Sequence, residues 1–205
     1  NYAIIMNGPR GWSGPEYAQG WSFNVPTAEF YNSFEQGDSR RDATVLDIEA
    51  FAAATGANYT EGYDHTGYFN NKYIPRAGES GGQTELNYLT NFRIIRYSDV
   101  LLMAAEAYNR GGIDDGLAQE FMNQVRRRAF GDNDHDISAS GTALTDAIWE
   151  ERKFELSLEG HRFFDLVRTG RAASIIAGFI EGKHEVFPIP QQEVDISGLT
   201  QNAGY

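Results

Sequence analysis

Aromatic and polar side chains gather in a glycine-rich stretch near the start of the chain, GPRGWSGPEYAQGWSF, residues 8–23. A flat indole or phenol ring can cover the C–H patch of a sugar ring through dispersion and weak C–H contacts. Neighbouring amide and guanidinium groups can bind the sugar's hydroxyl groups by hydrogen bonds. This chemistry predicts a ligand-binding surface of seven residues: Asn7, Arg10, Trp12, Tyr17 and Trp21, with Tyr63 and Tyr68 in reserve from a later tyrosine-rich stretch.

The rings of this stretch have a structural alternative, because aromatic side chains on loops also fill gaps in the core beneath them. Gly11, Gly14 and Gly20 have no side chains with which to cover their neighbours. We therefore expect at least some of the four rings in this stretch to face solvent.

A second group of charged residues lies on one predicted helix: Arg152, Glu155, Glu159 and Arg162 follow one another at i, i+3, i+7 and i+10. Side chains at these spacings share a helix face, where alternating charges stabilise the helix. A glycosidase needs two carboxyl groups on opposite sides of the bond that it cleaves. Here both carboxylates point the same way, and the arginines keep them ionised. We expect a structural role for this face, no catalytic residues and no enzymatic activity.

A similar argument applies to Asp99 and Glu106, which lie seven residues apart and so on one helix face. Arg126 and Arg128 lie on the next predicted helix. We expect at least one of the two acids to form an ion pair with one of these arginines.

Metal and cofactor signals are weak. Asp132, Asp134 and Asp136 alternate as in a calcium loop, but Ile137 and Ala143 stand where an EF-hand needs glycine and glutamate. The histidines have no paired spacing of the kind that binds zinc, and no phosphate-binding or dinucleotide motif is present. We expect no metal and no cofactor.

Bulk composition limits the function classes further. The 205 residues carry a net charge of −12, which is spread over both halves, so nucleic-acid binding is not expected. The chain has no cysteine and no apolar run long enough to span a bilayer. It begins at Asn1 rather than methionine, and we therefore expect a fragment of a longer protein.

Periodicity and turn residues predict a mainly α fold in two segments. Residues 1–91 are rich in loops and aromatic rings, with short helices at about 27–35 and 44–55 and few short strands. Residues 92–205 are helical, and the first helix carries a stripe that we expect to face the core: Ile94, Tyr97, Leu101, Ala104, Ala105 and Tyr108.

The first two helices of the second segment form a hairpin about as long as one tetratricopeptide unit of ~34 residues. The second helix is expected to begin near Asp114, to present Leu117, Phe121 and Val125 to the core, and to end at Gly131. One such unit cannot bury its apolar face alone. Either residues 1–91 cover that face, or further repeats precede the chain.

The remaining expectations concern the last quarter of the chain. A third long helix is predicted from about Thr142 through residue 170, bent at Gly160, and a short helix over 171–178. The stretch HEVFPIPQQEV, residues 184–194, is expected to be extended because Pro188 and Pro190 disfavour helix.

Six segments, taken in order, resemble the C-terminal half of the SusD/RagB family: GWSFNVPTAEFYNSFEQGDSRRDATVLD, RIIRYSDVLLMAAEAYNR, NQVRRRA, LTDAIWEERKFELSLEGHRFFDLVRTG, FPIPQQEV and QNAGY. Members of this family are glycan-binding lipoproteins on the outer membrane of Bacteroidota. They are usually much longer than this chain, with most tetratricopeptide helices and a lipid-modified cysteine in the other half.

The resemblance implies a SusD-like fold and oligosaccharide binding at the cell surface, with delivery to a SusC-like TonB-dependent transporter. It implies that loop aromatics such as Trp12 and Tyr17 line the glycan site, and that a lipid anchor lies upstream of this fragment. Because some members favour peptides, the alternative is a peptide or protein interaction module of tetratricopeptide type.

Overall fold

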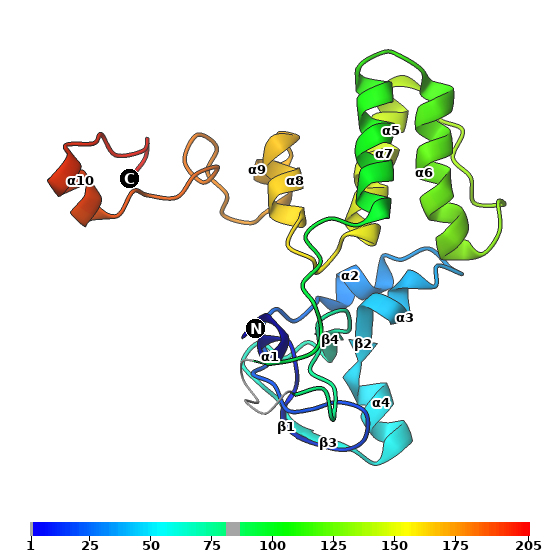
Figure 1. Ribbon diagram of the computed structural model, residues 1–205, viewed down its shortest axis with the longest axis vertical. Helices are drawn as coiled ribbons and strands as arrows, with labels where there is room; N and C mark the ends of the chain where they lie inside the picture. The colour runs from blue at the N-terminus through cyan, green and yellow to red at the C-terminus, as the bar shows by residue number, and fades with distance from the viewer. Residues whose placement is uncertain (1, 81–86) are drawn as a thin grey trace. The chain divides into compact units, whose positions relative to one another are not determined.

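A computed structural model describes residues 2–80 and 87–205 of the chain (Figure 1). The chain forms two compact units, the first ending at Glu159 and the second spanning Gly160–Tyr205. The compositional boundary expected near residue 91 lies inside the first unit.

The early part of the first unit is built from short elements. Its helices are α1 (Tyr2–Met6), α2 (Ala28–Asn32), α3 (Arg40–Thr44) and α4 (Ile48–Thr55). Its strands are β1 (Arg10–Ser13), β2 (Val45–Asp47), β3 (Asn58–Thr60) and β4 (Tyr68–Asn70). In the described residues these form two antiparallel pairs, β1 with β3 and β2 with β4.

Local signals explain where α4 begins and ends. The Asp47 carboxylate accepts a hydrogen bond from the Ala50 N–H at 2.9 Å, which caps the first turn. Gly56 has φ of 73°, the left-handed conformation that ends many helices. The predicted helix is confirmed from Ile48 onward, but residues 45–47 form strand β2 because they pair with β4. The β-branched Val45 suits that strand.

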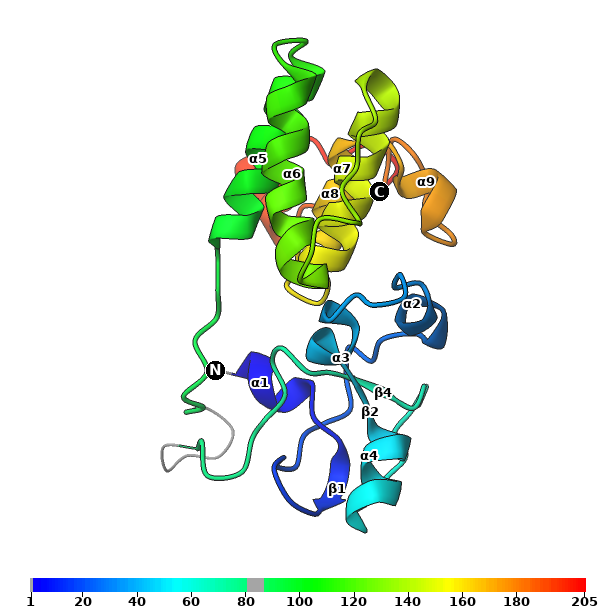
Figure 2. The same cartoon turned by 90° about the vertical axis from the view of Figure 1, so that its right-hand side faces the viewer.

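Three long helices form the rest of the first unit: α5 (Tyr97–Arg110), α6 (Asp115–Phe130) and α7 (Gly141–Glu155). They pack against one another, as Figures 1 and 2 show. Fully buried side chains from all three meet in one core that includes Leu102, Met122, Leu144 and Ile148. The hairpin of α5 and α6 therefore buries apolar surface against α7.

The predicted hairpin is confirmed with two corrections. Helix α6 is capped by Asp114 and ends at Gly131 as expected, but Leu117 is exposed. Helix α5 begins only at Tyr97, because Arg96 before it has extended backbone. Ile94 and Tyr97 are 75% and 72% exposed, so the expected core-facing stripe is wrong at its first two positions.

The third predicted helix is two separate helices. Helix α7 ends at Glu155, and α8 (Arg162–Arg168) begins in the second unit. Leu158 and Gly160 have φ of 63° and 88°, which a continuous right-handed helix cannot accommodate.

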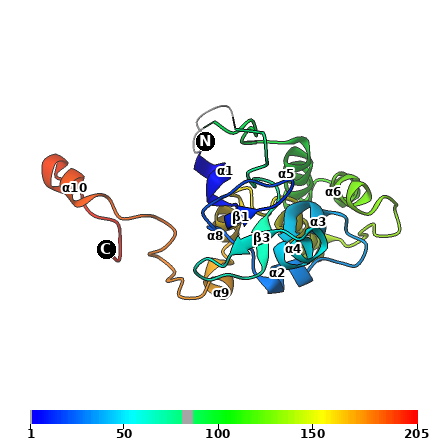
Figure 3. The same ribbon diagram turned by 90° about the horizontal axis from the view of Figure 1, so that it is seen from below.

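The second unit also contains α9 (Ala172–Ile175) and α10 (Gln191–Ser197). Between them the chain runs without helix or strand (Figure 3). The expectation of an extended tail is wrong after Pro190, which forms the N-cap of α10. Proline is tolerated at a helix start because the first N–H groups have no partner within the helix.

Candidate ligand-binding site

Three aromatic rings from separate elements meet in the first unit. Trp12 of β1 lies with its ring centroid 5.9 Å from that of Tyr17, and Phe51 of α4 lies 5.1 Å from Tyr17 and 6.0 Å from Trp12. This three-ring group packs against a core formed by Leu46, Ile48, Phe69 and Ile74. Trp12 is half-buried, whereas Tyr17 is only 5% exposed.

The burial of Tyr17 gives it a supporting role. Its ring lies under the Arg76 guanidinium, 5.2 Å from the ring centroid. Burial, and the nearby charge of Glu16, raise the pKa of its hydroxyl above the usual value. The surface of this group that is open to a ligand belongs to Trp12 and Phe51, both half-buried.

Trp21 belongs to a different group from Trp12. It is half-buried against Ile4, Ile5, Tyr73 and Tyr88. The exposed Arg10 donates a hydrogen bond from Nε to the Trp21 carbonyl at 2.7 Å, and its guanidinium lies 5.7 Å from the centroid of the Phe23 ring.

Asn7 is 5% exposed, and its amide group takes part in hydrogen bonds inside the protein. The amide nitrogen donates to the carbonyls of Ala3 and Tyr73, and the amide oxygen accepts from Asn24. Asn7 therefore holds the loop in place rather than presenting a free amide at the surface.

The two reserve tyrosines lie in different surroundings. Tyr63 is 91% exposed. Tyr68 is half-buried on β4, where its ring stacks on Tyr31 of α2 with the centroids 4.5 Å apart. The neighbouring Phe69 is fully buried, and alternate strand residues point to opposite faces of a sheet. Tyr68 therefore faces away from the core that supports Trp12.

The seven predicted residues are thus not gathered into one platform. The structure brings Trp12 together with Tyr17, and Arg10 together with Trp21. Sequence reasoning did not identify Phe51, although its position three residues after the buried Ile48 was a usable signal for the inner face of α4.

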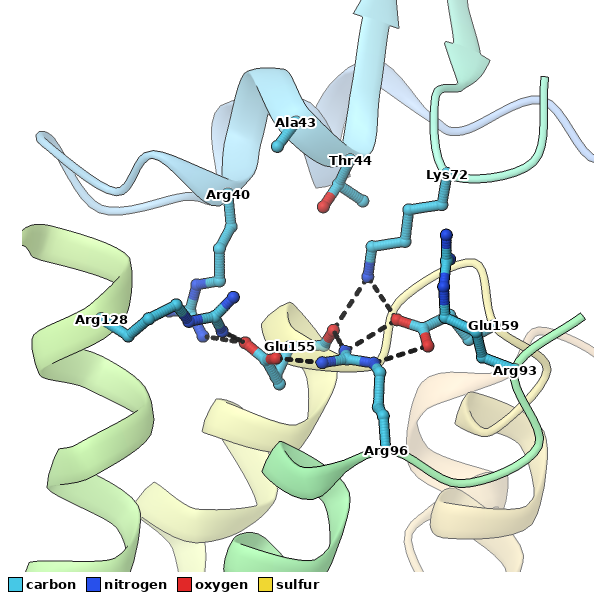
Figure 4. Close-up of a pocket in the computed structure, with 9 residues that line it drawn as sticks. All are labelled: Arg40, Ala43, Thr44, Lys72, Arg93, Arg96, Arg128, Glu155 and Glu159. Atoms are coloured by element: carbon cyan, nitrogen blue, oxygen red, sulfur yellow. Dashed lines mark hydrogen bonds and ion pairs between the residues drawn. The ribbon is translucent and has the colours of Figure 1, made fainter. Parts of the chain in front are cut away.

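A network of buried charges lies where α3, α7 and the segment before α5 meet (Figure 4). Glu155 contacts the guanidinium groups of Arg40, Arg96 and Arg128, with 3.1 Å between its Oε2 and Nη1 of Arg40. Burial by itself would raise the pKa of Glu155, but hydrogen bonds and charge from Arg96, and the charge of Arg128, hold it at about 2.

Glu159 is held in the same way. Its carboxylate accepts hydrogen bonds from Nζ of Lys72 at 2.6 Å and from Arg96. Burial opposes ionisation, yet Arg96 and Lys72 hold the pKa of Glu159 below its usual value. Neither carboxyl group is suited to donate a proton, since general acids need a raised pKa. The partners are Arg96, Arg40, Arg128 and Lys72, in place of the Arg152 and Arg162 that we expected.

The expected ion pair between α5 and α6 is replaced by other pairings. Asp99 pairs with Arg152 of α7 at 2.8 Å, and Glu106 pairs with Arg110 one turn along α5. Arg126 contacts Glu151 of α7 at 2.9 Å. Buried carboxylates of α7 attract the arginines of α6, because α7 lies against that helix.

Among the hollows beside this network, two share lining residues with each other. The first has a volume of about 280 Å³ and is lined by Arg40, Ala43, Thr44, Lys72, Arg93, Arg96, Arg128, Glu155 and Glu159. The second, of about 580 Å³, is lined by Ala43, Asn71, Lys72, Ile74, Arg76, Glu79, Thr90, Asn91 and Arg93. They share Ala43, Lys72 and Arg93.

Within the described residues, no helix has the length and hydropathy of a membrane-crossing segment. The same part of the chain contains no cluster of three or more histidine, aspartate or glutamate side chains placed to hold a metal ion.

Comparison with known proteins identifies the family to which this chain belongs. Residues 47–184 match the model of the SusD family. The whole chain aligns with SusD-like protein P2 of Formosa agariphila at 32% identity, over 45% of that protein. The chain belongs to the SusD family.

Solved structures of SusD-like and surface glycan-binding proteins have the same fold as this chain. A laminarin-binding SusD-like protein superposes with a TM-score of 0.87 at 41% identity, covering all of this chain and 44% of that one. Surface glycan-binding protein A from Bacteroides thetaiotaomicron, in complex with laminarihexaose, gives a TM-score of 0.85 at 32% identity over 98% of this chain and 46% of its own. The chain thus spans less than half the length of these relatives.

Proposed function

We propose that this chain is part of a bacterial surface receptor that binds an oligosaccharide without cleaving it. The observation that carries the proposal is the half-buried Trp12, held by Tyr17 and Phe51 so that part of the indole remains open to solvent. Rings supported in this way can cover the apolar face of a sugar without a large ordering cost. Structural relatives that bind laminarin or laminarihexaose support a glycan as ligand.

Trp21 and Arg10 form the second part of the proposed surface, with Tyr63 as an exposed reserve. Tyr17 and Asn7 act from beneath, since both are buried, and the half-buried Tyr68 stacks on Tyr31. The pKa values of Glu155 and Glu159 support binding without catalysis, because neither acid is poised to protonate a glycosidic oxygen.

The whole protein is proposed to sit on the outer membrane through a lipid anchor and to deliver its ligand to a SusC-like TonB-dependent transporter. Family membership supports this placement.

Calorimetric titration of the chain with laminarihexaose and a panel of other oligosaccharides tests the proposal. Trp12→Ala and Trp21→Ala should each weaken binding by roughly threefold to tenfold, the loss expected for one aromatic contact. Trp149→Ala, which removes an indole from α7, should leave binding unchanged and serves as the control. If a glycan binds and neither test variant weakens it, the assigned surface is wrong.

Peptide or protein binding is the second candidate, and one observation favours it. The exposed apolar side chains in and just before the first turns of α5 include Ile95, Tyr97, Val100 and Met103. Tyr97 is 72% exposed, more than the half-buried tryptophans. Binding of peptides but of no sugar in the same titrations, lost in Tyr97→Ala and retained in Trp12→Ala, would favour this alternative.

A further inference from the structure

Arg93 stands at the junction of the two hollows and lines both of them. Its side chain is exposed, and its backbone N–H donates to the Tyr73 hydroxyl at 3.2 Å. The guanidinium lies 5.4 Å from the centroid of the Tyr73 ring. A cation–π contact of this kind is an attraction between the charge and the ring, and it leaves the N–H groups available for hydrogen bonds to a ligand.

Two other cations that line the first hollow, Arg96 and Lys72, already make several hydrogen bonds within the protein. Arg96 donates to the carboxylates of Glu155 and Glu159, to the Glu155 carbonyl and to Ser98. Lys72 donates its three N–H bonds to Glu159 and to the carbonyls of Glu155 and Ser157.

Arg93 differs from these cations. With the residues that the structure describes, its guanidinium makes a ring contact but no ion pair, and Figure 4 draws no dashed line to it. The side chain of Asn91, which lines the second hollow beside it, is exposed as well.

The charge balance around Arg93 is positive although the chain is strongly acidic. The first hollow is lined by five cationic side chains and two carboxylates. The second hollow is lined by Lys72, Arg76 and Arg93 against the single acid Glu79. A positive hollow on a protein of net charge −12 attracts anions locally while the rest of the surface repels them.

We propose that Arg93 anchors a binding site for an oxyanion of the carboxylate or sulfate class, which enters the second hollow. The planar guanidinium forms two parallel hydrogen bonds to such a group. Asn91 also lines this hollow and provides an amide group that can bind the anion. The oxyanion is either a free ion or a substituent on a sugar, and binding at this site does not require a ligand on Trp12 or Trp21.

Titrations of the 205-residue chain at constant ionic strength test the proposal, because added salt screens charge interactions. The probes are sodium sulfate, sodium glucuronate and neutral glucose, with sodium chloride as the balancing salt. Saturable binding of sulfate or glucuronate is expected, with Arg93→Gln weakening it by roughly tenfold or more. Arg110→Gln changes the net charge equally at an exposed site far along α5, outside both hollows, and should bind as the wild type does.

The probes distinguish a free oxyanion from an acidic group carried on a sugar. Glucuronate binding more tightly than sulfate, with no binding of glucose, identifies an acidic sugar; equal affinity for sulfate and glucuronate identifies a free oxyanion. Arg93→Lys should bind with intermediate affinity, since it keeps the charge but loses the paired donors. The proposal is overturned if no probe binds saturably, or if Arg93→Gln, with wild-type thermal unfolding, binds as the wild type does. Trp12→Ala should bind sulfate and glucuronate as the wild type does, even if it no longer binds laminarihexaose.

Discussion

Glu155 shows how much of the stability of the first unit depends on a single buried carboxylate. Its side chain is 1% exposed and contacts three arginines, one from α3, one from the segment before α5 and one from α6. Taking a carboxylate out of water is costly, and only close cationic partners offset that cost. Ionised Glu155 therefore helps to hold α3 against the helices, together with Glu151 of α7, which also contacts Arg40.

Glu155→Gln should lower the free energy of unfolding at pH 7 by about 3–5 kcal/mol, the range for breaking a buried ion pair. Urea denaturation measures it. Glu120→Gln removes an exposed ion pair with Arg127 and should cost no more than about 1 kcal/mol.

The same carboxylate predicts a pH dependence. Its pKa is about 2 in the folded chain against an ordinary value of 4.5, so the stabilisation is complete above pH 4.5. As the pH falls from 4.5 towards 2, the unfolded chain takes up a proton that the folded chain does not, and the free energy of unfolding decreases. Glu155→Gln should lose this part of the decrease; a decrease as steep as that of the wild type would contradict the role assigned to Glu155.

Helix α6 shows how local sequence defines an element. The Asp114 carboxylate accepts a hydrogen bond from the Leu117 N–H at 3.0 Å, and Gly131 ends the helix with φ of 84°. Both residues act on neighbours within four positions along the chain, and both were identified from sequence. The start of α5 was not identified from sequence. Arg96 has extended backbone, and its side chain binds Glu155 and Glu159, which lie about sixty residues away along the chain.

Asp114→Ala should reduce the free energy of unfolding by about 1 kcal/mol, the usual cost of a lost N-cap. The matched control is Asp146→Ala, which replaces an exposed aspartate inside α7 and should be neutral or slightly stabilising because alanine favours helix. Thermal and urea unfolding of both variants measure the difference. Equal stabilities for the two variants would show that the cap contributes nothing.

The two units of the chain differ in how much apolar surface they bury. Within residues 160–205, all of which the structure describes, the buried apolar side chains are Leu166 and Ala172. Phe164, Phe187 and Ile196 are 67%, 82% and 74% exposed. A segment with so few buried contacts opens at low free-energy cost.

Limited proteolysis with trypsin should therefore cut the second unit first, for example after Lys183, and leave the three-helix core of α5, α6 and α7 intact. Mass spectrometry of the early fragments identifies the sites. First cuts after Arg126, Arg127 or Arg128 would contradict this order, since α6 packs in the core.

Local sequence was sufficient to predict most helices and several of their caps, because hydrophobic spacing and capping residues act within a few positions. The family resemblance came from six sequence segments that match in order. It also indicated correctly that Glu155 and Glu159 stay ionised beside cations. Tertiary structure alone decided which cations these are, since Arg40 lies 115 residues from Glu155 along the chain. It alone decided that Tyr17 is buried while Trp12 is only half-buried, because the depth of a loop ring depends on which distant elements pack around it.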